Sequence, residues 1–300
     1  MHPLKFFKKN CMQKIRGTLI PIGGNEDKGK GETENYTLEF IEGGILARVV
    51  AECSVKDPKI VIIPTASSIP VEVGENYIKA FTKLGCTDVH VLDIRSKEDA
   101  EKSESTALVK HANCIMFSGG NQSKITEKIG NTTLHKIIKE RYYTETGFVI
   151  AGTSAGAMAM SEEMIAGGSS TEAFIKGAVI MNKGLGLIPE LIIDTHFIQR
   201  GRFGRQSEAV ARFPELLGIG LAEDTGLIIK KGNELEVIGS GMIIIFDPAN
   251  LSHNNEKILE IGTPMTMTNL VVHVLSGGDR FNMETRKVDV LPLDAEIPFV

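Results

Sequence analysis

The sequence predicts an α/β fold in which a mostly parallel central sheet is sandwiched between helices and followed by a β-rich C-terminal portion. Three observations support this prediction. Short apolar runs with little alternation are typical of strands buried on both faces of a parallel sheet. Amphipathic segments separate these runs between Thr18 and Ile150, as in successive βαβ units. Beyond Glu223, short apolar runs separated by Gly, Asn and Asp indicate hairpins.

The expected elements follow the chain in order. Strands are expected first at Thr18–Ile22, Lys59–Ile63, Val89–Asp93, Cys114–Phe117 and Gly147–Ala151. Helices are expected within Thr37–Glu52, Asn76–Leu84 and Asn131–Tyr143. The C-terminal hairpins are expected to use Leu227–Ile229, Glu234–Ile238, Met242–Phe246, Met265–Leu275 and Lys287–Leu291. Ligands of such folds bind at the carboxyl ends of the strands, so the turns that follow the strands are the places to look for a site.

Composition and charge exclude several classes of function. The chain has 300 residues, 42% of them hydrophobic, and we expect a flexible N-terminal extension over 1–16 and a single domain over 17–300. A net charge of −5 gives no overall attraction to nucleic acid or to anionic membranes. No apolar stretch reaches the roughly 20 residues that span a bilayer, and the basic start lacks the apolar core of a secretory signal. Four scattered cysteines without zinc spacing favour a cytoplasmic protein without a metal.

The most informative motif is at residues 152–156, which read Gly-Thr-Ser-Ala-Gly. It follows an apolar run and precedes Ala157–Met164, which has helix-forming character. A strand that enters a sharp turn and opens a helix is the setting of a nucleophile elbow, in which the serine hydroxyl stands at the tip of the turn. The alternative is a serine that only caps a helix. The strand before the motif and the helix after it favour Ser154 as an acyl-transfer nucleophile.

A serine nucleophile needs a general base, and the chain offers seven histidines. Six of them lie at the N-terminus, in expected strands and helices or in a polar loop, and are interpreted as structural: His2, His90, His111, His135, His253 and His273. His196 differs because it follows Leu191–Asp194, an apolar run that indicates a strand. We therefore expect His196 at the carboxyl end of a strand, on the same rim as Ser154, and take it as the candidate general base.

The base in turn needs a carboxylate that orients its ring and stabilises the imidazolium. Asp194 is close in sequence, but a residue two positions away along an extended chain can point to the opposite face. Glu223 and Asp224 follow Gly218–Ala222, another strand-like run that ends at the rim. Spacing does not choose among these three acids. The order serine, histidine, acid differs from that of α/β-hydrolases and argues against an ordinary esterase or lipase.

Backbone donors and arginines near these residues indicate a site for an anionic substrate. The N–H of Ala155 is a natural oxyanion donor, and a second donor is expected from Gly119–Gly120, where missing side chains permit close approach. Three arginines follow His196 within Arg200–Arg205. Their guanidinium groups are suited to paired hydrogen bonds with carboxylates or phosphates. The alternative is a solvated helix face with local ion pairs, and the sequence contains no phosphate-binding loop motif.

Six short segments together resemble the serine peptidase family that contains the cyanophycinases and the aspartate-specific dipeptidases. They are Ile22–Asp27, Phe117–Gln122, Gly152–Ala157, Gly184–Leu187, Asp194–Phe197 and Arg200–Arg205. These segments are spread in order over most of the chain, and their joint occurrence by chance is very improbable. The resemblance implies a three-layer sandwich like that of class I glutamine amidotransferases, a homodimer and no cofactor.

The resemblance also implies roles for particular residues. It implies a triad of Ser154, His196 and Glu223, which selects Glu223 from the three acids. It implies oxyanion donors at Gly120 and Ala155. The implied substrate-binding positions are Gln122, Asp194, Thr195, Arg200, Arg202 and Arg205, with Thr195 standing where the family usually has glutamine. The arginines would hold a substrate carboxylate, and acids such as Asp194 would meet a substrate guanidinium.

The implied substrate is cyanophycin, a poly-aspartate chain with arginine joined to each β-carboxyl. The implied reaction is a serine-type hydrolysis to β-aspartyl-arginine dipeptides. Two alternatives remain. One is a dipeptidase or isoaspartyl peptidase of the same family that acts on small β-aspartyl or other acidic peptides. The other is a catalytically silent relative that only binds anions, against which the presence of Ser154, His196 and Glu223 argues.

Overall fold

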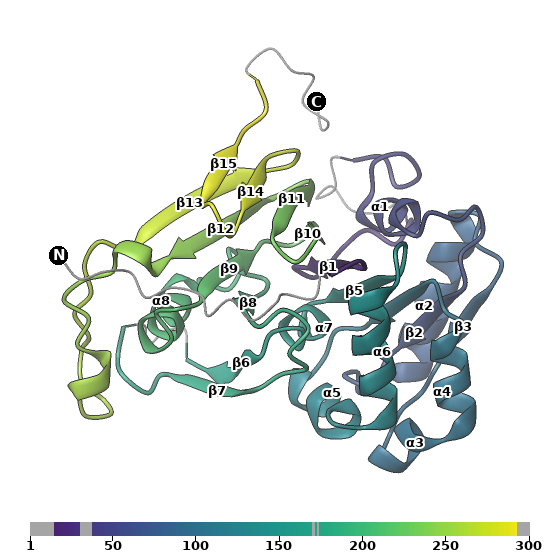
Figure 1. Cartoon of the computed structure of the whole chain (residues 1–300), viewed down its shortest axis with the longest axis horizontal. Helices are drawn as coiled ribbons and strands as arrows, with labels where there is room; N and C mark the ends of the chain where they lie inside the picture. Colours follow the sequence, from purple (N-terminus) through teal and green to yellow (C-terminus); the bar gives the residue numbers. More distant parts are fainter. Residues whose placement is uncertain (1–14, 31–37, 170–171, 173, 293–300) are drawn as a thin grey trace.

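The computed structural model describes residues 15–30, 38–169, 172 and 174–292 and shows a large sheet with helices packed beside it (Figure 1). Among the described residues, nine strands form this sheet: β1 Thr18–Ile22, β2 Ile60–Ile63, β3 Val89–Val91, β4 Cys114–Phe117, β5 Val149–Thr153, β10 Thr225–Lys230, β11 Glu234–Gly239, β14 Arg280–Asn282 and β15 Lys287–Asp289. They lie side by side in the order β15-β14-β11-β10-β1-β5-β4-β2-β3.

The sheet is parallel on one side of β1 and antiparallel on the other. Strands β1, β5, β4, β2 and β3 all pair in parallel. Strand β10 runs against β1, and β11, β14 and β15 continue the antiparallel part. The predicted α/β class, with a parallel sheet and a β-rich C-terminal portion, is confirmed. The five strands predicted before the serine motif overlap β1 to β5.

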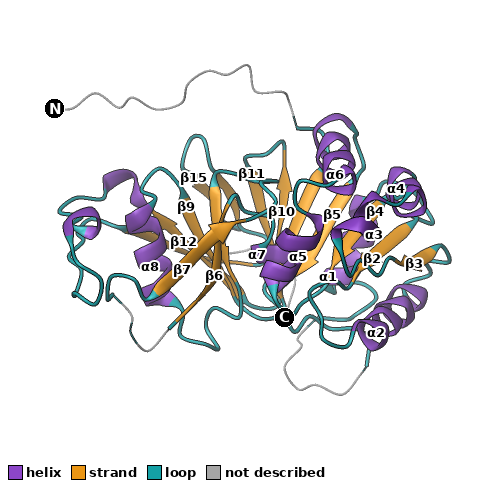
Figure 2. Cartoon of the chain, turned by 90° about the horizontal axis from the view of Figure 1, so that it is seen from below, coloured by secondary structure: helices purple, strands orange, loops and turns teal. Residues whose placement is uncertain are grey.

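Helices cover both faces of the parallel part (Figure 2). The described residues contain α1 Ile45–Glu52, α2 Pro70–Lys83, α3 Lys97–Glu101, α4 Ser103–Lys110, α5 Gln122–Ile129, α6 Thr133–Thr144, α7 Ala155–Met158 and α8 Phe203–Arg212, and the 3-10 turns η1 Pro248–Asn250 and η2 Glu256–Ile258. Successive strand residues face opposite sides of a sheet. Ile20 and Met116 therefore pack with α1 and α2, whereas Leu19 and Phe117 pack with α3 to α6.

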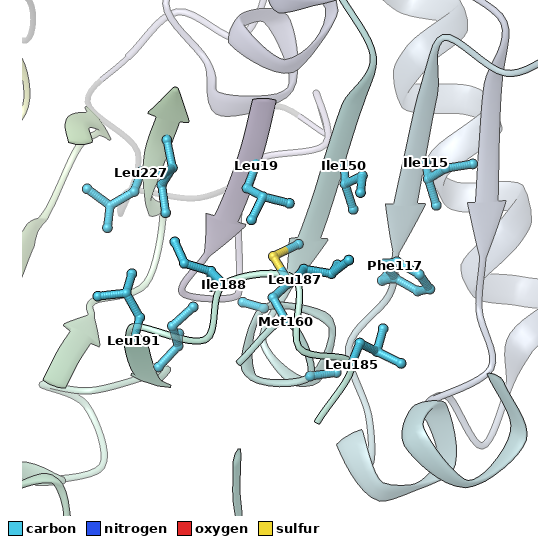
Figure 3. Packing of buried hydrophobic residues seen from close by; sticks show 14 of the residues in the cluster. Leu19, Ile115, Phe117, Ile150, Met160, Leu185, Leu187, Ile188, Leu191 and Leu227 are labelled. Carbon is cyan, nitrogen blue, oxygen red and sulfur yellow. The ribbon is translucent and has the colours of Figure 1, made fainter. Parts of the chain in front are cut away.

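The larger hydrophobic cluster also includes side chains from residues 185–188, which lie between β7 Val179–Lys183 and β8 Leu191–Asp194 in the sequence. Figure 3 shows Leu19, Ile150 and Leu227 on their strands, with Leu187 and Ile188 packed across their ends. These side chains are almost completely buried. Burial of one large aliphatic side chain stabilises a protein by about 1.5–3 kcal/mol. The cluster thus fixes residues 185–188 against the carboxyl ends of the parallel strands.

A second sheet carries the next strands: β8 Leu191–Asp194, β9 Leu217–Leu221, β12 Met242–Asp247 and β13 Val271–Ser276. Their order is β13-β12-β9-β8, and β8 and β9 are parallel, with Asp194 opposite Gly220. Helix α8 connects β8 to β9 and forms a separate βαβ unit with them. One expectation is therefore corrected: His196 follows a strand of this second sheet and does not share the rim of the sheet that carries Ser154.

The helix expected after the serine motif is a single turn, α7. The chain then enters β6 Glu163–Gly168, which pairs antiparallel with β7 Val179–Lys183. The carbonyl of Met160 accepts hydrogen bonds from the N–H groups of Leu187 and Ile188, at 2.9 and 3.1 Å. Because this carbonyl is already occupied by another segment, it does not continue the helical hydrogen-bond pattern.

Two predictions concern parts of the chain at or near its start. Residues 1–14 lie outside the described residues, so the flexible extension expected over 1–16 and the single domain expected over 17–300 stay predictions. Of the first expected helix, within 37–52, the described residues 38–52 are helical over Ile45–Glu52. In the part of the chain that the structure describes, no helix combines the length and apolar character needed to cross a bilayer.

Candidate active site

Ser154 lies at the sharp bend between β5 and α7. Its backbone has φ 51° and ψ −110°, a left-handed conformation that is unfavourable for a residue other than glycine. The bend is packed tightly against the neighbouring strand, since a Cβ atom on Gly156 would lie 2.6 Å from the carbonyl oxygen of Phe117. Small residues around the serine are therefore a steric requirement of this turn, as a nucleophile elbow demands.

Three side chains from separate loops form a hydrogen-bonded chain. Ser154 Oγ lies 3.0 Å from His196 Nε2, and His196 Nδ1 lies 2.6 Å from Glu223 Oε1. Ser154 follows β5, whereas His196 and Glu223 follow the parallel neighbours β8 and β9. Of the three acids that spacing left open, the structure places Glu223 against the imidazole. Asp194 and Asp224 have other partners.

The environment of His196 favours the neutral form of its imidazole. Burial lowers the pKa of His196, the hydrogen bond with Glu223 raises it, and the nearby charges of Arg200 and Arg202 lower it, with a net result below the usual 6.5. In the tautomer that fits these contacts, Nδ1–H donates to the carboxylate of Glu223. The lone pair of Nε2 is then directed at the hydroxyl of Ser154 and can accept its proton.

Two backbone N–H groups near Ser154 have no hydrogen-bond acceptor among the described residues. A Cβ atom on Gly119 would lie 3.5 Å from the Cβ of Ser154, so the glycine pair after β4 lies directly beside the serine. Among the described residues, the N–H groups of Gly120 and Ala155 donate to no other group of the protein. Their neighbours on this turn are fixed, since Asn121 N–H donates to the carbonyl of Ala66 at 3.0 Å. Free, rigidly held donors are what an oxyanion needs.

Asp194 is fully buried and its carboxylate is saturated with hydrogen bonds. Arg205 donates from Nε and Nη2 to its two oxygens, both at 2.6 Å. Arg202 Nη1 and the N–H of Thr195 donate to Oδ1, each at 2.8 Å. The structure therefore does not present Asp194 or Arg205 to a substrate, contrary to the expectation that they bind it. The local ion pairs of the stated alternative are present, but this face of α8 is buried and not solvated.

The other expected substrate-binding residues differ in how free they are. Arg200 is exposed, and its guanidinium has no ion-pair or hydrogen-bond partner within the described ranges. Arg202 is partly exposed and also donates to the carbonyl of Thr195 at 2.5 Å. Gln122, the first residue of α5, donates to the carbonyl of Ile165 at 2.8 Å. Thr195 is fully buried, so its side chain does not face a substrate.

Sequence reasoning assigned no role to Asn25 and Glu26, although both lie in a segment that carried the family resemblance. Asn25 Nδ2 donates to Glu223 Oε2 at 3.2 Å. Glu26 is buried and accepts a hydrogen bond of 2.5 Å from the hydroxyl of Thr153, the residue before the serine. The only signal in the sequence was that this segment follows the expected strand Thr18–Ile22 and carries part of the family resemblance, and it did not reveal the contact with Glu223.

Comparisons with known proteins agree with this geometry. The sequence profile of peptidase family S51 matches residues 39–238. A cyanophycinase from Trichormus variabilis is 38% identical over 284 residues, which cover 95% of this chain and 91% of the relative. A cyanophycinase from Geminocystis herdmanii is 37% identical over 276 residues, which cover 92% of this chain and 97% of the relative.

A solved structure supports the fold. A peptidase from an acI-B1 Actinobacterium superposes with a TM-score of 0.61 over 90% of this chain and 98% of that protein, at 22% sequence identity. At 22% identity, the similarity is evidence for the fold only. The sequence matches go further, because they extend over almost the whole chain and include the segments that hold Ser154, His196 and Glu223. The chain belongs to peptidase family S51 and is a hydrolase of the serine peptidase class.

Proposed function

We propose that this chain hydrolyses cyanophycin to β-aspartyl-arginine dipeptides through an acyl-enzyme on Ser154. One observation carries the chemical part of the proposal, namely the hydrogen-bonded chain of Ser154, His196 and Glu223. The substrate part is supported by the relatives that are named cyanophycinases and that align over nearly their full length.

The proposed reaction has two halves. Ser154 Oγ attacks a backbone amide carbonyl of the substrate while His196 Nε2 takes its proton, and the N–H groups of Gly120 and Ala155 stabilise the oxyanion. His196 then gives the proton to the leaving amine, and the C–N bond breaks. In the second half water attacks the acyl-enzyme, its proton passes to His196 and then to Ser154 Oγ, and the carboxylic acid product leaves. Glu223 orients the ring and stabilises the imidazolium throughout.

We propose that the free guanidinium group of Arg200 binds a substrate carboxylate. It is exposed, and its charge acts on His196, so it lies near the proposed nucleophile. Arg202 has fewer free N–H groups for a substrate because its Nη1 already donates to Asp194. The substrate guanidinium has to find acceptors other than the saturated carboxylate of Asp194. Thr195, where the family usually has glutamine, bears on substrate preference only through the packing of the buried loop beside His196.

A comparison of substrates tests the proposal. Purified protein is incubated with insoluble cyanophycin, with β-aspartyl dipeptides and with α-aspartyl dipeptides, and soluble products are identified by mass. We expect release of β-aspartyl-arginine from the polymer. Cleavage of the dipeptides alone would support the dipeptidase alternative, and no cleavage of any substrate would support the silent anion-binding alternative. The proposed homodimer is tested on the same sample by sedimentation, which should give about twice the mass of one chain.

A further inference from the structure

The turn that follows β1 is hydrogen-bonded to all three loops of the candidate site. The carbonyls of Ile22, Gly23 and Gly24 are consecutive along the chain. They accept the N–H groups of Ser154, His196 and Asp224, respectively, each at 2.9 Å. Asp224 directly follows Glu223, so each member of the proposed triad is tied, itself or through its neighbour, to one of three successive peptide groups.

The fit between this turn and the loops leaves no space for side chains. A Cβ atom on Gly23 would lie 1.8 Å from the carbonyl oxygen of Ala222, in the loop that leads to Glu223. A Cβ atom on Gly24, whose φ is +106°, would lie 2.4 Å from Cε1 of His196. Two glycines in sequence are thus needed for the turn to lie in contact with both loops.

The side chains of the same turn reach Glu223 and Thr153, the residue before Ser154. Asn25 Nδ2 donates to Glu223 Oε2, the oxygen that does not contact the imidazole. Glu26 accepts hydrogen bonds from the hydroxyl of Thr153 at 2.5 Å and from the hydroxyl of Tyr77. Thr153 immediately precedes Ser154, so Glu26 holds the last strand residue before the strained bend.

Glu26 carries out this role as a carboxylate in a buried place. Its side chain is completely inaccessible to solvent and lies 2.9 Å from Lys28 Nζ. Burial raises the pKa of Glu26, but the charge of Lys28 and the hydrogen bonds from Thr153 and Tyr77 outweigh this and bring the pKa below its usual value. A buried charge that is paired and fully hydrogen-bonded has a strongly preferred geometry, because breaking any partner leaves it uncompensated.

We propose that Asn25 and Glu26 are positioning residues for the hydrolytic site. Asn25 orients the carboxylate of Glu223 so that Oε1 faces His196, and Glu26 holds the nucleophile turn through Thr153. The inference rests on the proposed role of Ser154 as the nucleophile. Ser154, His196 and Asp224 all have positive φ, at 51°, 47° and 46°. Such conformations persist only where surrounding contacts enforce them, and the turn after β1 supplies a contact to each.

The test measures the reactivity of Ser154 without any peptide substrate. A fluorophosphonate forms a P–O bond with Ser154 Oγ, fluoride leaves, and the proton passes to His196. We expect Asn25→Ala to slow labelling roughly tenfold, and up to about 100-fold, because a small misplacement of catalytic groups costs that much. The matched control is Asn233→Ala, which removes a hydrogen bond of the same type and length, from Asn233 Nδ2 to Glu284 Oε2 at 3.2 Å. It should label at the wild-type rate.

A charge change gives a readout that a merely structural role would not move. Asn25→Asp places a second carboxylate beside Glu223 and so favours the imidazolium of His196. We expect the acidic limb of the labelling profile, and the His196 pKa measured by NMR, to move to higher pH. An unchanged rate in Asn25→Ala together with an unchanged His196 pKa in Asn25→Asp would overturn the role of Asn25.

The role of Glu26 is tested through its partner Thr153, and the melting temperature of each variant shows whether the fold is kept. Thr153→Val removes only the hydroxyl that donates to Glu26, and we expect slower labelling with an unchanged pH midpoint. Glu26→Gln should slow labelling as well. The control is Glu256, another buried acid, which pairs with Lys176 at 3.6 Å, and Glu256→Gln should not slow labelling. Equal rates for Thr153→Val and wild type would overturn the role of Glu26. If wild-type Ser154 is not labelled at all, the proposed function fails, and the NMR titration of His196 still decides the role of Asn25.

Discussion

Arg205 and Asp194 form a two-armed ion pair beneath the candidate site, with N···O distances of 2.6 Å for both arms. Asp194 is fully buried and Arg205 nearly so. Helix α8 brings the arginine back to the end of β8, eleven positions along the chain. The pair fixes the strand end from which the loop with His196 starts.

The first prediction follows from this pair. Asp194→Asn leaves the charges of Arg205 and Arg202 uncompensated in a buried place, and we expect the free energy of unfolding to fall by about 3–5 kcal/mol. Urea unfolding measures it. The exposed pair of Arg280 and Glu236 is the control, and its removal by Arg280→Gln should cost about 1 kcal/mol or less. Unchanged stability of Asp194→Asn with a raised KM would instead support direct substrate binding by Asp194.

The second prediction concerns Arg200, the exposed arginine proposed to hold a substrate carboxylate. Arg200→Ala should raise KM about tenfold or more, because a hydrogen bond to a charged group contributes roughly 1.5–3 kcal/mol. The melting temperature should not change, since the guanidinium contacts no described partner. Arg280→Ala removes an exposed arginine of the far hairpin and serves as the control. A wild-type KM for Arg200→Ala would remove this residue from the proposed site.

The third prediction is the pH dependence of hydrolysis. The reaction needs neutral His196, whose pKa lies below 6.5 because burial outweighs the hydrogen bond with Glu223. The acidic limb of kcat/KM should therefore have its midpoint below pH 6.5. Glu223→Gln removes the charge that favours the imidazolium, so the midpoint should move lower still, and kcat should fall by about 10³–10⁴. A midpoint above 6.5 in the wild type would contradict this description of the site.

The fourth prediction concerns Asp224, which neighbours the proposed acid but faces away from it. Burial raises the pKa of Asp224 from 3.8 to about 6 in the folded protein, although Ser240 and the backbone of Asp27 donate hydrogen bonds to it. The folded state thus binds the proton more tightly than the unfolded state. The stabilisation by this proton is complete below pH 3.8 and is lost as pH rises through about 6.

The corresponding variant is Asp224→Asn, which cannot titrate. The wild type should lose about 2 kcal/mol of stability from this group between pH 4 and pH 7, and the variant should lack that contribution to the slope. Urea unfolding at several pH values measures both proteins. Parallel stability curves for the two proteins would show that Asp224 does not titrate in this range.

Much of the site was predictable because local patterns carry it. The apolar run, the small residues and the following turn of helix made Ser154 recognisable, and a strand end marked His196. The choice of Glu223 over Asp194 and Asp224 came from the family resemblance, since spacing left it open. The structure gives the physical reason, because Asp194 is held by Arg205 and only Glu223 reaches the imidazole.

Other features depend on contacts between distant segments and were not predictable from spacing. The strands β8 and β9 pair in a second sheet, and α8, which connects them, packs against both, an arrangement that the sequence pattern does not reveal. The helix after Ser154 ends at Met158, and the carbonyls of residues 159–162 that follow it accept hydrogen bonds from residues 184–188 instead of from a further helical turn. The saturation of Asp194 likewise depends on where α8 places Arg205. The contact of Asn25 with Glu223 joins residues 198 positions apart.

The most direct test of the central claim compares wild-type protein with Ser154→Ala on insoluble cyanophycin. The variant lacks only the hydroxyl, so circular dichroism and the melting temperature should match the wild type. We expect the wild type to release β-aspartyl-arginine and Ser154→Ala to release it several orders of magnitude more slowly, at about 10⁻⁶ of the wild-type rate. Release at a comparable rate by the folded variant would contradict it.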